Sequence, residues 1–400
     1  MTRVLFLAES FHPVLGGGEA HLRALGAALV ACGDQATVLT RRGGASWPAK
    51  EEIDGIRVHR VPPAGPGRSG KYLMIPAAAR ALVREARRHD LLVVRGTRVL
   101  GVPGLVAGRV AGLPVVLQPE INGELDGCAF TWGKPWAQGT RARLVEAGVA
   151  VRNRWLRDGE AFVAMSQQIR DEMIGAGIPA ERVALIPHGV DTARFRPATP
   201  GEAAALRARL RLPAGTLAVY TGRLLRGKGL ETLLEALASV AAAEPDLRLV
   251  LVGSGEGQSL SVEDALRRRA ADAPLAGRVV FAGRVDAVED WLRAADLFLF
   301  PSLFEGLGIS LVEAAACGLA AIGSRTGGIV DVIEDARSGV LVEPDNAAGL
   351  ASALRALAGD GGRRAEMGHQ ARRVARERFD SRDALARYRA LFREVSSRRP

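Results

Sequence analysis

Cysteine, aromatic residues and lysine are all scarce in this chain of 400 residues. Its three cysteines, Cys32, Cys128 and Cys317, are scattered and odd in number, and their spacing fits no metal site. A disulfide framework is therefore not expected, and the protein is expected to reside in a reducing compartment. Aromatic residues make up only 5% of the chain and no nucleic-acid recognition motif occurs, so nucleic acid is not predicted as a partner.

Long apolar runs are also missing. No segment approaches the ~18 consecutive apolar residues that a membrane-spanning helix needs. The first apolar run, Arg3–Ala8, ends at Glu9, which is too soon for a signal peptide, and it reads as the first strand of a sheet. These absences predict a protein that is made and kept in the cytoplasm.

Positive charge is in excess, with a formal net charge of +10. Such a balance favours anionic partners such as phosphates, nucleic acid or anionic lipid. The segment Arg141–Arg157 is basic and roughly amphipathic, so it could rest on an anionic leaflet as a helix, or it could be an ordinary solvated helix. Peripheral contact with the inner face of a membrane therefore stays open beside the cytoplasmic prediction.

Strand-like and helix-like segments alternate along the chain, which predicts an α/β fold with parallel sheets covered on both faces. A Pro-, Gly- and Ala-rich stretch, Pro197–Ala204, is the predicted linker between two domains of ordinary size. Helices are expected notably at Glu19–Cys32 and Ala77–Arg88. The expected strands are Val4–Ala8, Thr37–Thr40, Ile56–Val61, Leu91–Val94, Val115–Leu117, Ala161–Met165, Val183–Ile186, Ala218–Thr221, Arg248–Val252, Val279–Phe281, Leu297–Phe300, Ala320–Ile322 and Val340–Val342.

The most informative stretch is Pro301–Gly318, which follows the strand pattern Leu297–Phe300 and runs into a helix. It carries Glu305 in a Gly-rich turn and Glu313 on the helix. A strand, a Gly-rich turn and a helix start at the carboxyl end of a parallel sheet together form a ligand site. The alternative is an ordinary helix start with a glutamate favoured by the helix dipole.

The backbone at this helix start has a chemistry of its own. Free N–H groups there favour an anion such as a diphosphate, and they belong to Gly308, Ile309, Ser310 and Leu311. Two carboxylates beside an anion must face its neutral groups, and carboxylates accept hydrogen bonds from vicinal diols. A diphosphate flanked by two polyols is a nucleotide sugar, which is the predicted ligand.

The chain uses arginine far more often than lysine, and one of its few lysines stands in a Gly-rich turn. Lys228 stands between Gly227 and Gly229, in a Gly-rich turn that follows the predicted strand Ala218–Thr221 and precedes a helix. A compact ammonium on a flexible stem suits a diphosphate in a tight turn, and Arg223 can add a planar fork to the same oxygens. An ordinary solvated loop is the alternative. The chain has lysine only at Lys50, Lys71, Lys134 and Lys228.

With these motifs the chain resembles the retaining glycosyltransferases of the GT-B fold, in the large glycogen-synthase-like and mannosyltransferase-like family four, also called group one. Pro301–Gly318 is similar to the Glu-x7-Glu motif of that family. Gly16–Glu19 matches less strongly in the first half. The other matching segments are Ile186–Phe195, Thr221–Gly229, Val252–Gly257, Ser324–Glu334 and Ser338–Asp345.

The resemblance implies two Rossmann-like parallel-sheet domains that face each other across a cleft. The expected domains are residues 1–196, joined by a C-terminal helix at about 380–400, and residues 197–379. The first would lie on the acceptor side and the second would bind the nucleotide sugar. The final helices, over Ala365–Ser396, are expected to return to the first domain.

The resemblance also implies roles for the charged residues. Arg223 and Lys228 would bind the diphosphate of the donor, Glu313 the ribose diol, and Glu305 the hydroxyls of the donor sugar, orienting its anomeric carbon. Departure and attack would occur on the same face of the sugar, without a covalent nucleophile. No cofactor or metal is expected, since no Asp-x-Asp stands at a strand end where a metal would bridge phosphates.

Smaller elements of the donor site are expected at three loops. Gly17 and Gly18 would face the donor from the first domain, and Gly253 would allow close approach of the backbone. Arg284 and Val285 lie in the part that resembles the site of the nucleotide base. A plain flexible loop is the alternative for each of them.

One departure from the family lies in the first domain. Many relatives have a histidine at the end of a strand where this chain has Glu120, with Glu124 and Asn122 as rival candidates in the same loop. A carboxylate accepts hydrogen bonds but donates one only when its pKa is raised. The catalytic candidates are therefore Glu305, Lys228, Arg223 and Glu120, while His188 is expected to be structural.

The predicted function is transfer of a hexosyl group from a nucleotide-diphosphate sugar to an acceptor. A lipid-linked acceptor in surface polysaccharide or glycolipid synthesis is favoured by the basic surface, and a soluble small molecule is the alternative. A sugar epimerase of the same fold should lack the paired Glu305 and Glu313. A nicotinamide-dependent oxidoreductase would need G-x-G-x-x-G, which Gly16–Glu19 does not supply. A catalytically silent relative is a further alternative.

Overall fold

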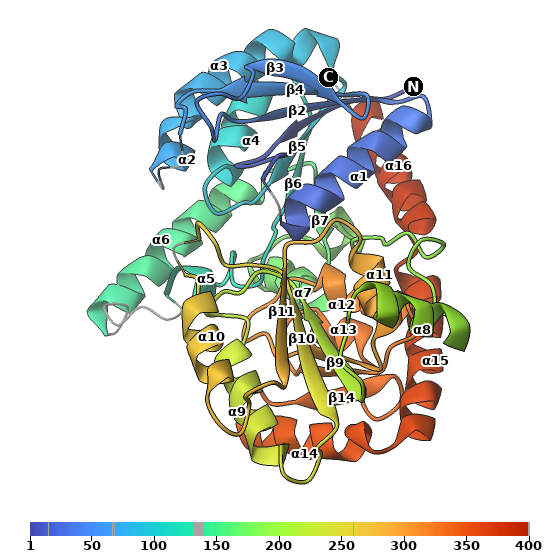
Figure 1. Ribbon diagram of the computed structural model, residues 1–400. Coiled ribbons are helices and arrows are strands. Elements are labelled where there is room, and N and C mark those ends of the chain that lie inside the picture. The colour runs from blue at the N-terminus through green and yellow to red at the C-terminus, as the bar shows by residue number, and fades with distance from the viewer. Residues whose placement is uncertain (15, 66, 68, 132–138, 259, 399–400) are drawn as a thin grey trace. The chain divides into compact units, whose positions relative to one another are not determined.

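The computed structural model describes residues 1–14, 16–65, 67, 69–131, 139–258 and 260–398. The chain forms two compact units. Unit 1 comprises Met1–His188 and Arg382–Pro400, and unit 2 comprises Gly189–Ser381. Each is built around a mostly parallel β-sheet with helices packed against it (Figure 1). The unit boundary precedes the sequence-based boundary at residue 196, so residues 189–196 pack with unit 2.

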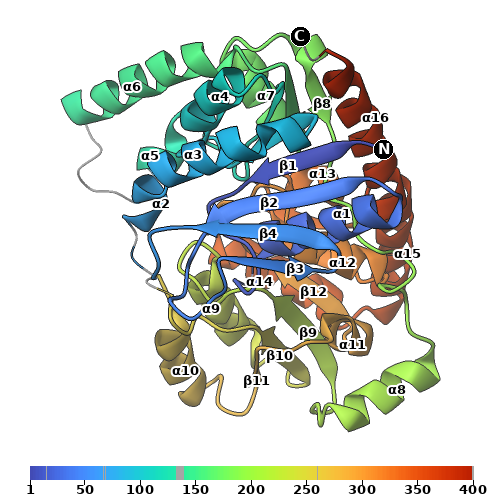
Figure 2. The ribbon, with the colours of Figure 1, turned by 90° about the horizontal axis from the view of Figure 1, so that it is seen from above.

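Unit 1 contains an eight-stranded sheet with the order β3-β4-β2-β1-β5-β6-β7-β8. Figure 2 shows β1, β2 and β4 side by side at its first half. β3 pairs antiparallel with β4, and it was not predicted because its charged sequence, Lys-Glu-Glu-Ile, lacks the apolar run of a buried strand. The strands are β1 (Arg3–Leu7), β2 (Gln35–Arg41), β3 (Lys50–Ile53), β4 (Ile56–Val61), β5 (Leu91–Arg95), β6 (Val115–Gln118), β7 (Ala161–Ala164) and β8 (Val183–Leu185).

Helices connect these strands, as the parallel pairing requires. The first of them begins at Gly17, within the Gly triplet that follows β1. The helices of unit 1 are α1 (Gly17–Ala31), α2 (Gly70–Leu73), α3 (Ile75–Glu85), α4 (Gly101–Val110), α5 (Cys128–Thr131), α6 (Thr140–Leu156), α7 (Gln167–Gly175) and α16 (Ser381–Ser397), with short 3₁₀ turns at η1 (Ala86–Arg88) and η2 (Ala180–Arg182).

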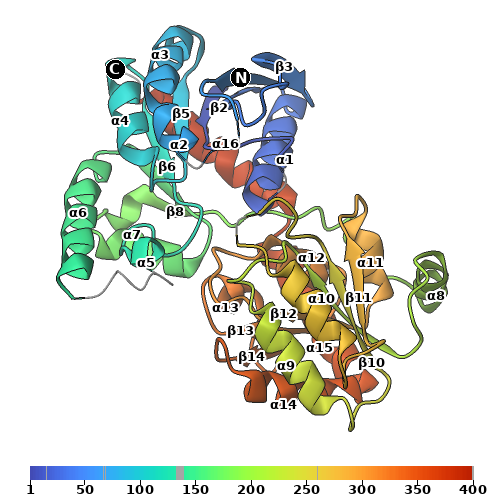
Figure 3. The same cartoon turned by 60° about the vertical axis from the view of Figure 1, so that its left-hand side comes forward.

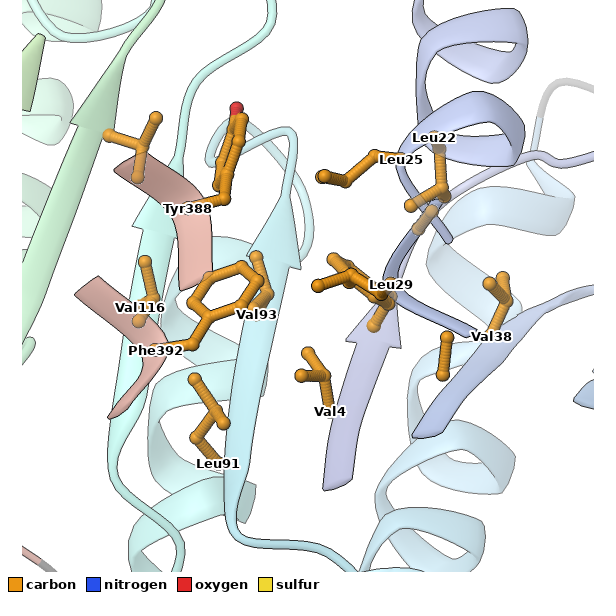
Figure 4. Packing of buried hydrophobic residues seen from close by; sticks show 14 of the residues in the cluster. Val4, Leu22, Leu25, Leu29, Val38, Leu91, Val93, Val116, Tyr388 and Phe392 are labelled. Carbon is orange, nitrogen blue, oxygen red and sulfur yellow. The ribbon is translucent and has the colours of Figure 1, made fainter. Parts of the chain in front are cut away.

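The last helix, α16, belongs to the core of unit 1. Its Tyr388 and Phe392 are buried against β1, β5 and β6, and Phe6 meets the Phe392 ring edge-on with centroids 6.2 Å apart (Figure 4). The Tyr388 hydroxyl also accepts a hydrogen bond of 2.9 Å from the amide of Gln118 on β6. The predicted return of a C-terminal helix to the first domain is therefore confirmed for α16.

Helix α15 (Gly361–Arg378) belongs to unit 2. Arg372 on α15 donates hydrogen bonds to the carbonyls of Ala316 at 2.6 Å and Phe195 at 2.7 Å, and both of these residues lie in unit 2. The expected range Ala365–Ser396 thus comprises two helices, of which α15 belongs to unit 2 and α16 to unit 1. The helical pattern is continuous enough to hide the break, which falls at Phe379–Asp380.

Replacing Phe392 by alanine should destabilise unit 1 by about 3 kcal/mol or more, because it removes a fully buried aromatic ring and leaves a cavity. We expect amide exchange in β1, β5 and β6 to become at least about a hundredfold faster. Arg393→Ala on the exposed side of the same helix is the control and should leave exchange nearly unchanged. Equal acceleration by both substitutions would contradict the packing described for α16.

Unit 2 contains a six-stranded parallel sheet with the order β11-β10-β9-β12-β13-β14. Its strands are β9 (Thr216–Thr221), β10 (Leu247–Val252), β11 (Val279–Gly283), β12 (Leu297–Phe300), β13 (Ala321–Ser324) and β14 (Gly339–Val342). Its helices are α8 (Pro200–Arg209), α9 (Leu230–Val240), α10 (Glu263–Ala271), α11 (Val288–Ala294), α12 (Ile309–Ala316), α13 (Ile329–Val332), α14 (Ala347–Ala358) and α15.

The predicted linker Pro197–Ala204 is partly wrong, since α8 begins at Pro200. Thr199 and Glu202 form a capping box, in which each side chain accepts a hydrogen bond from the backbone N–H of the other. Proline is well tolerated in the first helical turn, because its missing N–H would have no partner there. Proline and glycine in this stretch suggested a linker, but they mark a helix start.

Strand order reverses direction in both sheets, and this places the ligand sites. In unit 2, β10 and β11 are added on one side of β9, and β12, β13 and β14 are added on its other side. A crevice for ligands forms outside the carboxyl ends of strands at such a switch point. The loops that follow β9 and β12 are therefore the candidate site of unit 2.

Candidate functional site

The two loops at the switch point of unit 2 pack directly on each other. The N–H of Leu303, after β12, donates a 2.9 Å hydrogen bond to the carbonyl of Gly227, after β9. Gly229 has a φ of +64° and faces the β12 loop, where a Cβ would lie 2.0 Å from the carbonyl oxygen of Pro301. Only glycine fits both conditions. Lys228 is thereby held against the loop that carries Glu305.

Lys228 and Glu305 form an ion pair. The ammonium Nζ lies 2.6 Å from Oε2 of Glu305, and both side chains are mostly buried, with 21% and 17% of their surfaces exposed. The ammonium also lies 5.9 Å from the centre of the Phe300 ring at the end of β12. From the sequence each residue was assigned to a different part of a ligand, and nothing in the spacing indicated that they touch. In this structure each one neutralises the other.

Helix α12 begins beside this pair. Gly308 precedes its first turn with a φ of +87°, and a Cβ there would lie 2.7 Å from the Phe300 ring. The N–H groups of Leu311 and Val312 already donate to the carbonyl of Gly308, at 2.9 and 3.2 Å. Among the residues that the structure describes, no side chain caps this helix. The N–H groups left to face an anion are consequently those of Gly308, Ile309 and Ser310, without that of Leu311.

Glu313 lies one turn further into α12, in a mostly buried position. Burial raises the pKa of its carboxyl to about 7, partly opposed by the positive charge of Arg194. Arg194 is itself held by Glu289 on α11, through two hydrogen bonds of 2.9 Å each. The negative charge of Glu289 raises the pKa of Glu313 further. Glu313 is therefore a carboxyl whose charge changes near neutral pH.

The remaining predicted positions of unit 2 lie at the carboxyl ends of β9, β10 and β11. Gly253 has a φ of +134°, and a Cβ there would lie 1.9 Å from the carbonyl oxygen of Gly222, so the close approach that requires glycine is between two loops of the protein. Arg223 is exposed, and its carbonyl accepts a 3.0 Å hydrogen bond from Tyr220. Arg284 is exposed beside Glu256, and Val285 is half-buried.

In unit 1 the candidate residues gather around a buried arginine. Arg95, at the end of β5, is 1% exposed; its Nε lies 3.2 Å from Oε1 of Glu120, and it donates a 3.2 Å hydrogen bond to the carbonyl of Gly18. A Cβ at Gly18 would lie 3.3 Å from the Glu120 carboxylate. Gly17 begins α1 next to it. Arg95 was missed from the sequence, because a charged residue at the end of an apolar strand gave no sign of its partner.

The environment of Glu120 sets it apart from its rivals. Burial raises the pKa of Glu120 although the Arg95 guanidinium opposes the shift, and its side chain is 40% exposed. Glu124 is 3% exposed and accepts hydrogen bonds from the N–H and hydroxyl of Thr97, at 2.8 and 2.7 Å. Asn122 is 1% exposed. Only Glu120 of the three presents a carboxylate to solvent.

His188 lies inside unit 1. Its ring stacks on that of His21 with centroids 3.7 Å apart, and burial lowers the pKa of both imidazoles well below the ordinary value. Both are therefore neutral near pH 7. A buried, stacked and neutral ring supports a structural role for His188.

Within the described residues, no three His, Cys, Asp or Glu side chains are grouped as a metal site. Over the same part of the chain, no helix has the length and apolar character needed to cross a bilayer.

Two family models match the chain. The model described as "Glycosyl transferase 4-like domain" matches residues 16–189, and the one described as "Glycosyl transferases group 1" matches residues 215–360. The first covers most of unit 1 and the second covers the sheet and the candidate site of unit 2.

Curated relatives and solved structures agree with these matches. The D-inositol 3-phosphate glycosyltransferase of Pseudarthrobacter chlorophenolicus is 30% identical over 372 residues, which cover 89% of this chain and 85% of that protein. The enzyme of the same name from Xylanimonas cellulosilytica is 30% identical over 402 residues, covering 96% and 93%. Sucrose-phosphate synthase from Thermosynechococcus elongatus superposes with a TM-score of 0.83 at 23% identity, covering 99% of this chain and 100% of that one.

HepE of Anabaena, in complex with UDP and glucose, superposes with a TM-score of 0.77 at 22% identity, covering 98% of this chain and 100% of that one. The fold is thus that of the GT-B enzymes, and the class is a glycosyltransferase. The chain belongs to the group 1 glycosyltransferases of family four, as its sequence suggested.

Proposed function

We propose that this glycosyltransferase moves a hexosyl group from a nucleoside-diphosphate hexose with retention of configuration and without a metal ion. The observation that carries the proposal is the pair formed by Lys228 and Glu305, 2.6 Å apart beside the open N–H groups of α12. A cation and a helix start suit a diphosphate, and a carboxylate suits sugar hydroxyls. Both functions meet at one switch point.

The leaving diphosphate is stabilised by fixed positive charge. A diphosphate at the start of α12 would accept hydrogen bonds from the N–H groups of Gly308, Ile309 and Ser310. Its negative charge would also draw the Lys228 ammonium away from Glu305. Arg223, exposed at the end of β9, adds a guanidinium. These groups do most for the reaction when charge develops on the leaving phosphate, since they need little rearrangement at that moment.

Glu305 then takes up its second role. Once Lys228 turns to the diphosphate, the Glu305 carboxylate is free to accept hydrogen bonds from hydroxyls of the donor sugar and to orient the anomeric carbon. The acceptor attacks on the face from which the diphosphate leaves, so no side chain has to form a covalent bond. Glu313 holds the ribose diol one turn along α12, and Arg284 and Val285 flank the base.

Glu120 is the proposed acceptor-side group of unit 1. Its carboxylate is the half-exposed one, and Arg95 fixes its position from inside the sheet. Gly18 leaves room beside it, because a side chain there would crowd the carboxylate. The raised pKa of Glu120 also allows a protonated fraction that can donate a hydrogen bond, which a fully ionised carboxylate cannot.

The donor is proposed to be a UDP-hexose. HepE, with the same fold, was solved with UDP-glucose, whereas the related fold of Arabidopsis starch synthase IV was solved with ADP. A screen of UDP-, GDP- and ADP-hexoses at about a hundred times Kd should raise the melting temperature by roughly 5–10 °C for the correct donor only. A melting point unmoved by every nucleotide sugar would contradict the proposed function.

Two acceptor classes have support. A lipid-linked acceptor for surface polysaccharide or glycolipid synthesis is favoured by the net charge of +10 and by the exposed basic helix α6. A small phosphorylated polyol is favoured by the curated relatives, which are named D-inositol 3-phosphate glycosyltransferases. The two acceptors are distinguished by which of them is glycosylated when each is offered with the donor found by the screen. EDTA is present in these assays to test that no metal ion is needed. Proton NMR of the product then tests retention at the anomeric carbon.

A further inference from the structure

Helix α6 of unit 1 has an inner face and an outer face, and within the described residues only the inner one is buried. Val149, Asn153 and Leu156 are buried against the unit, and the Asn153 amide donates a 2.6 Å hydrogen bond to the carbonyl of Leu125. α6 lies at the edge of unit 1, and its first turns extend beyond the neighbouring helices (Figures 2 and 3). The inner face fixes the helix on the unit, so the orientation of its outer face is fixed too.

The outer face carries a stripe of large apolar side chains. Leu144, Val151 and Trp155 are 67%, 64% and 52% exposed. At 3.6 residues per turn they project within an arc of about 40°, on the side opposite Val149 and Asn153. Exposed apolar groups scattered singly are ordinary, but an aligned stripe on one helix indicates an interaction surface.

Positive charge borders this stripe on both sides. Arg141 projects about 60° to one side of it, and Arg154 and Arg143 project about 80–100° to the other. All three are exposed, and for none of them is an ion pair recorded within the described residues. The only acidic residue of α6, Glu146, lies on the far side, about 160° from the stripe.

We infer that the outer face of α6 docks on an anionic lipid surface. An apolar stripe with arginines on both shoulders matches the boundary between acyl chains and anionic headgroups, where a helix lies flat with its apolar face sunk in. The helix has 17 residues and no described helix can cross a bilayer, so α6 rests on the surface. Pairing with a second copy through this stripe would bring the arginine shoulders of both molecules together, which like charge opposes.

The inference concerns binding alone, so it is tested without donor or acceptor. The full-length protein is floated with vesicles of phosphatidylglycerol and phosphatidylcholine in equal parts, and with vesicles of phosphatidylcholine only. We expect binding to the anionic vesicles, weakened by added salt, and little binding to the neutral ones. Replacing Leu144, Val151 and Trp155 together by serine should weaken binding at least tenfold.

Arginine variants separate this surface from general attraction by the basic protein. Arg141→Gln, Arg143→Gln and Arg154→Gln should each weaken vesicle binding on the order of fivefold, and the triple variant that combines them should weaken it further. A matched triple variant at exposed arginines elsewhere should change it less than about twofold; it combines Arg87→Gln, Arg363→Gln and Arg376→Gln. The melting temperature of each variant without ligand, compared with that of the parent protein, checks that every variant is folded.

Several results would overturn the inference. Absence of binding to anionic vesicles is one, and equal loss of binding in the two arginine triples is another. A third is a dimer in size-exclusion chromatography with light scattering that the serine variant dissociates, since the stripe would then be an interface between copies. If vesicles bind as expected while no nucleotide sugar does, the docking surface stands and the proposed function falls.

Discussion

Lys228→Ala should lower kcat by about a hundredfold to a thousandfold, the effect of removing one fixed group that stabilises developing charge. Donor affinity should fall much less, by roughly tenfold, because backbone N–H groups of α12 and Arg223 still receive the diphosphate. The difference between the two losses is the point of the prediction. A group that acts mainly as the phosphate leaves is seen in kcat, and one that binds ground state and transition state equally is seen in KM.

The pairing of Lys228 with Glu305 makes the prediction sharper. In Lys228→Ala the mostly buried Glu305 carboxylate loses its cation, and an incoming diphosphate meets an unpaired negative charge. Glu305→Gln removes that charge instead. Free UDP should therefore bind Glu305→Gln at least as tightly as the parent, while turnover falls because the sugar hydroxyls lose their charged acceptor.

Single-turnover kinetics and calorimetry with UDP measure these two quantities separately. Arg226→Ala is the matched control, since Arg226 is an exposed cation in the same loop and is not paired with Glu305. The double variant of Lys228 and Glu305 should lose less activity than the product of the single losses, because the two residues act together. An unchanged kcat in Lys228→Ala would remove the residue from the reaction.

Much of the fold could be predicted because the buried strands of a parallel sheet are nearly continuous apolar runs. Leu91–Val94 and Leu297–Phe300 were found in this way, each within a residue of its observed end. The exceptions follow the same logic. β3 is a charged strand at a sheet edge, and α8 starts with the proline and glycine that usually mark a linker.

The candidate site was predictable where one stretch of chain carries all of its parts. The turn and helix start at Gly308 are local, and so is the glycine environment of Lys228. Contacts between distant segments were not predictable. The sequence does not show that Lys228 pairs with Glu305 or that Arg95 pairs with Glu120. Nor does it show that the N–H of Leu311 donates a hydrogen bond to the carbonyl of Gly308.

The ionisation of Glu313 was equally hidden, because a pKa depends on the packing around the carboxyl and on charges brought in by other segments. On the sequence alone Glu313 was an ordinary carboxylate that accepts hydrogen bonds. In the structure, burial raises its pKa to about 7, and Arg194 and Glu289 approach it from elements elsewhere in the chain. This changes what its removal and its titration are expected to do.

Glu313→Ala should weaken binding of the nucleotide sugar by about 30- to 150-fold, since it removes one or two charge-assisted hydrogen bonds worth about 2–3 kcal/mol. The calorimetric Kd of the donor measures it. Glu366→Ala, at an exposed acidic position on α15, is the control and should leave Kd unchanged. Unchanged donor binding in Glu313→Ala would refute its contact with the ribose.

The pH dependence of the same residue gives an independent test. The diol binds the ionised carboxylate, so donor affinity should rise with pH through the pKa of about 7 in the free enzyme. Between pH 6 and pH 8 the rise should be roughly tenfold, as the ionised fraction increases. A nucleotide sugar must be used, because the terminal phosphate of free UDP titrates in this range.

Glu313→Gln should flatten this pH profile and change stability in a defined direction. The folded-state pKa lies above the unfolded value, so between about pH 4.5 and pH 7 the folded state binds more protons and stability falls as pH rises. Above pH 7 the ionised carboxylate therefore lowers the free energy of unfolding, and replacing it by a neutral amide removes this loss. Glu313→Gln should melt higher than the parent at pH 8 while binding donor more weakly. A variant that is less stable and still pH-dependent would show that the titrating group lies elsewhere.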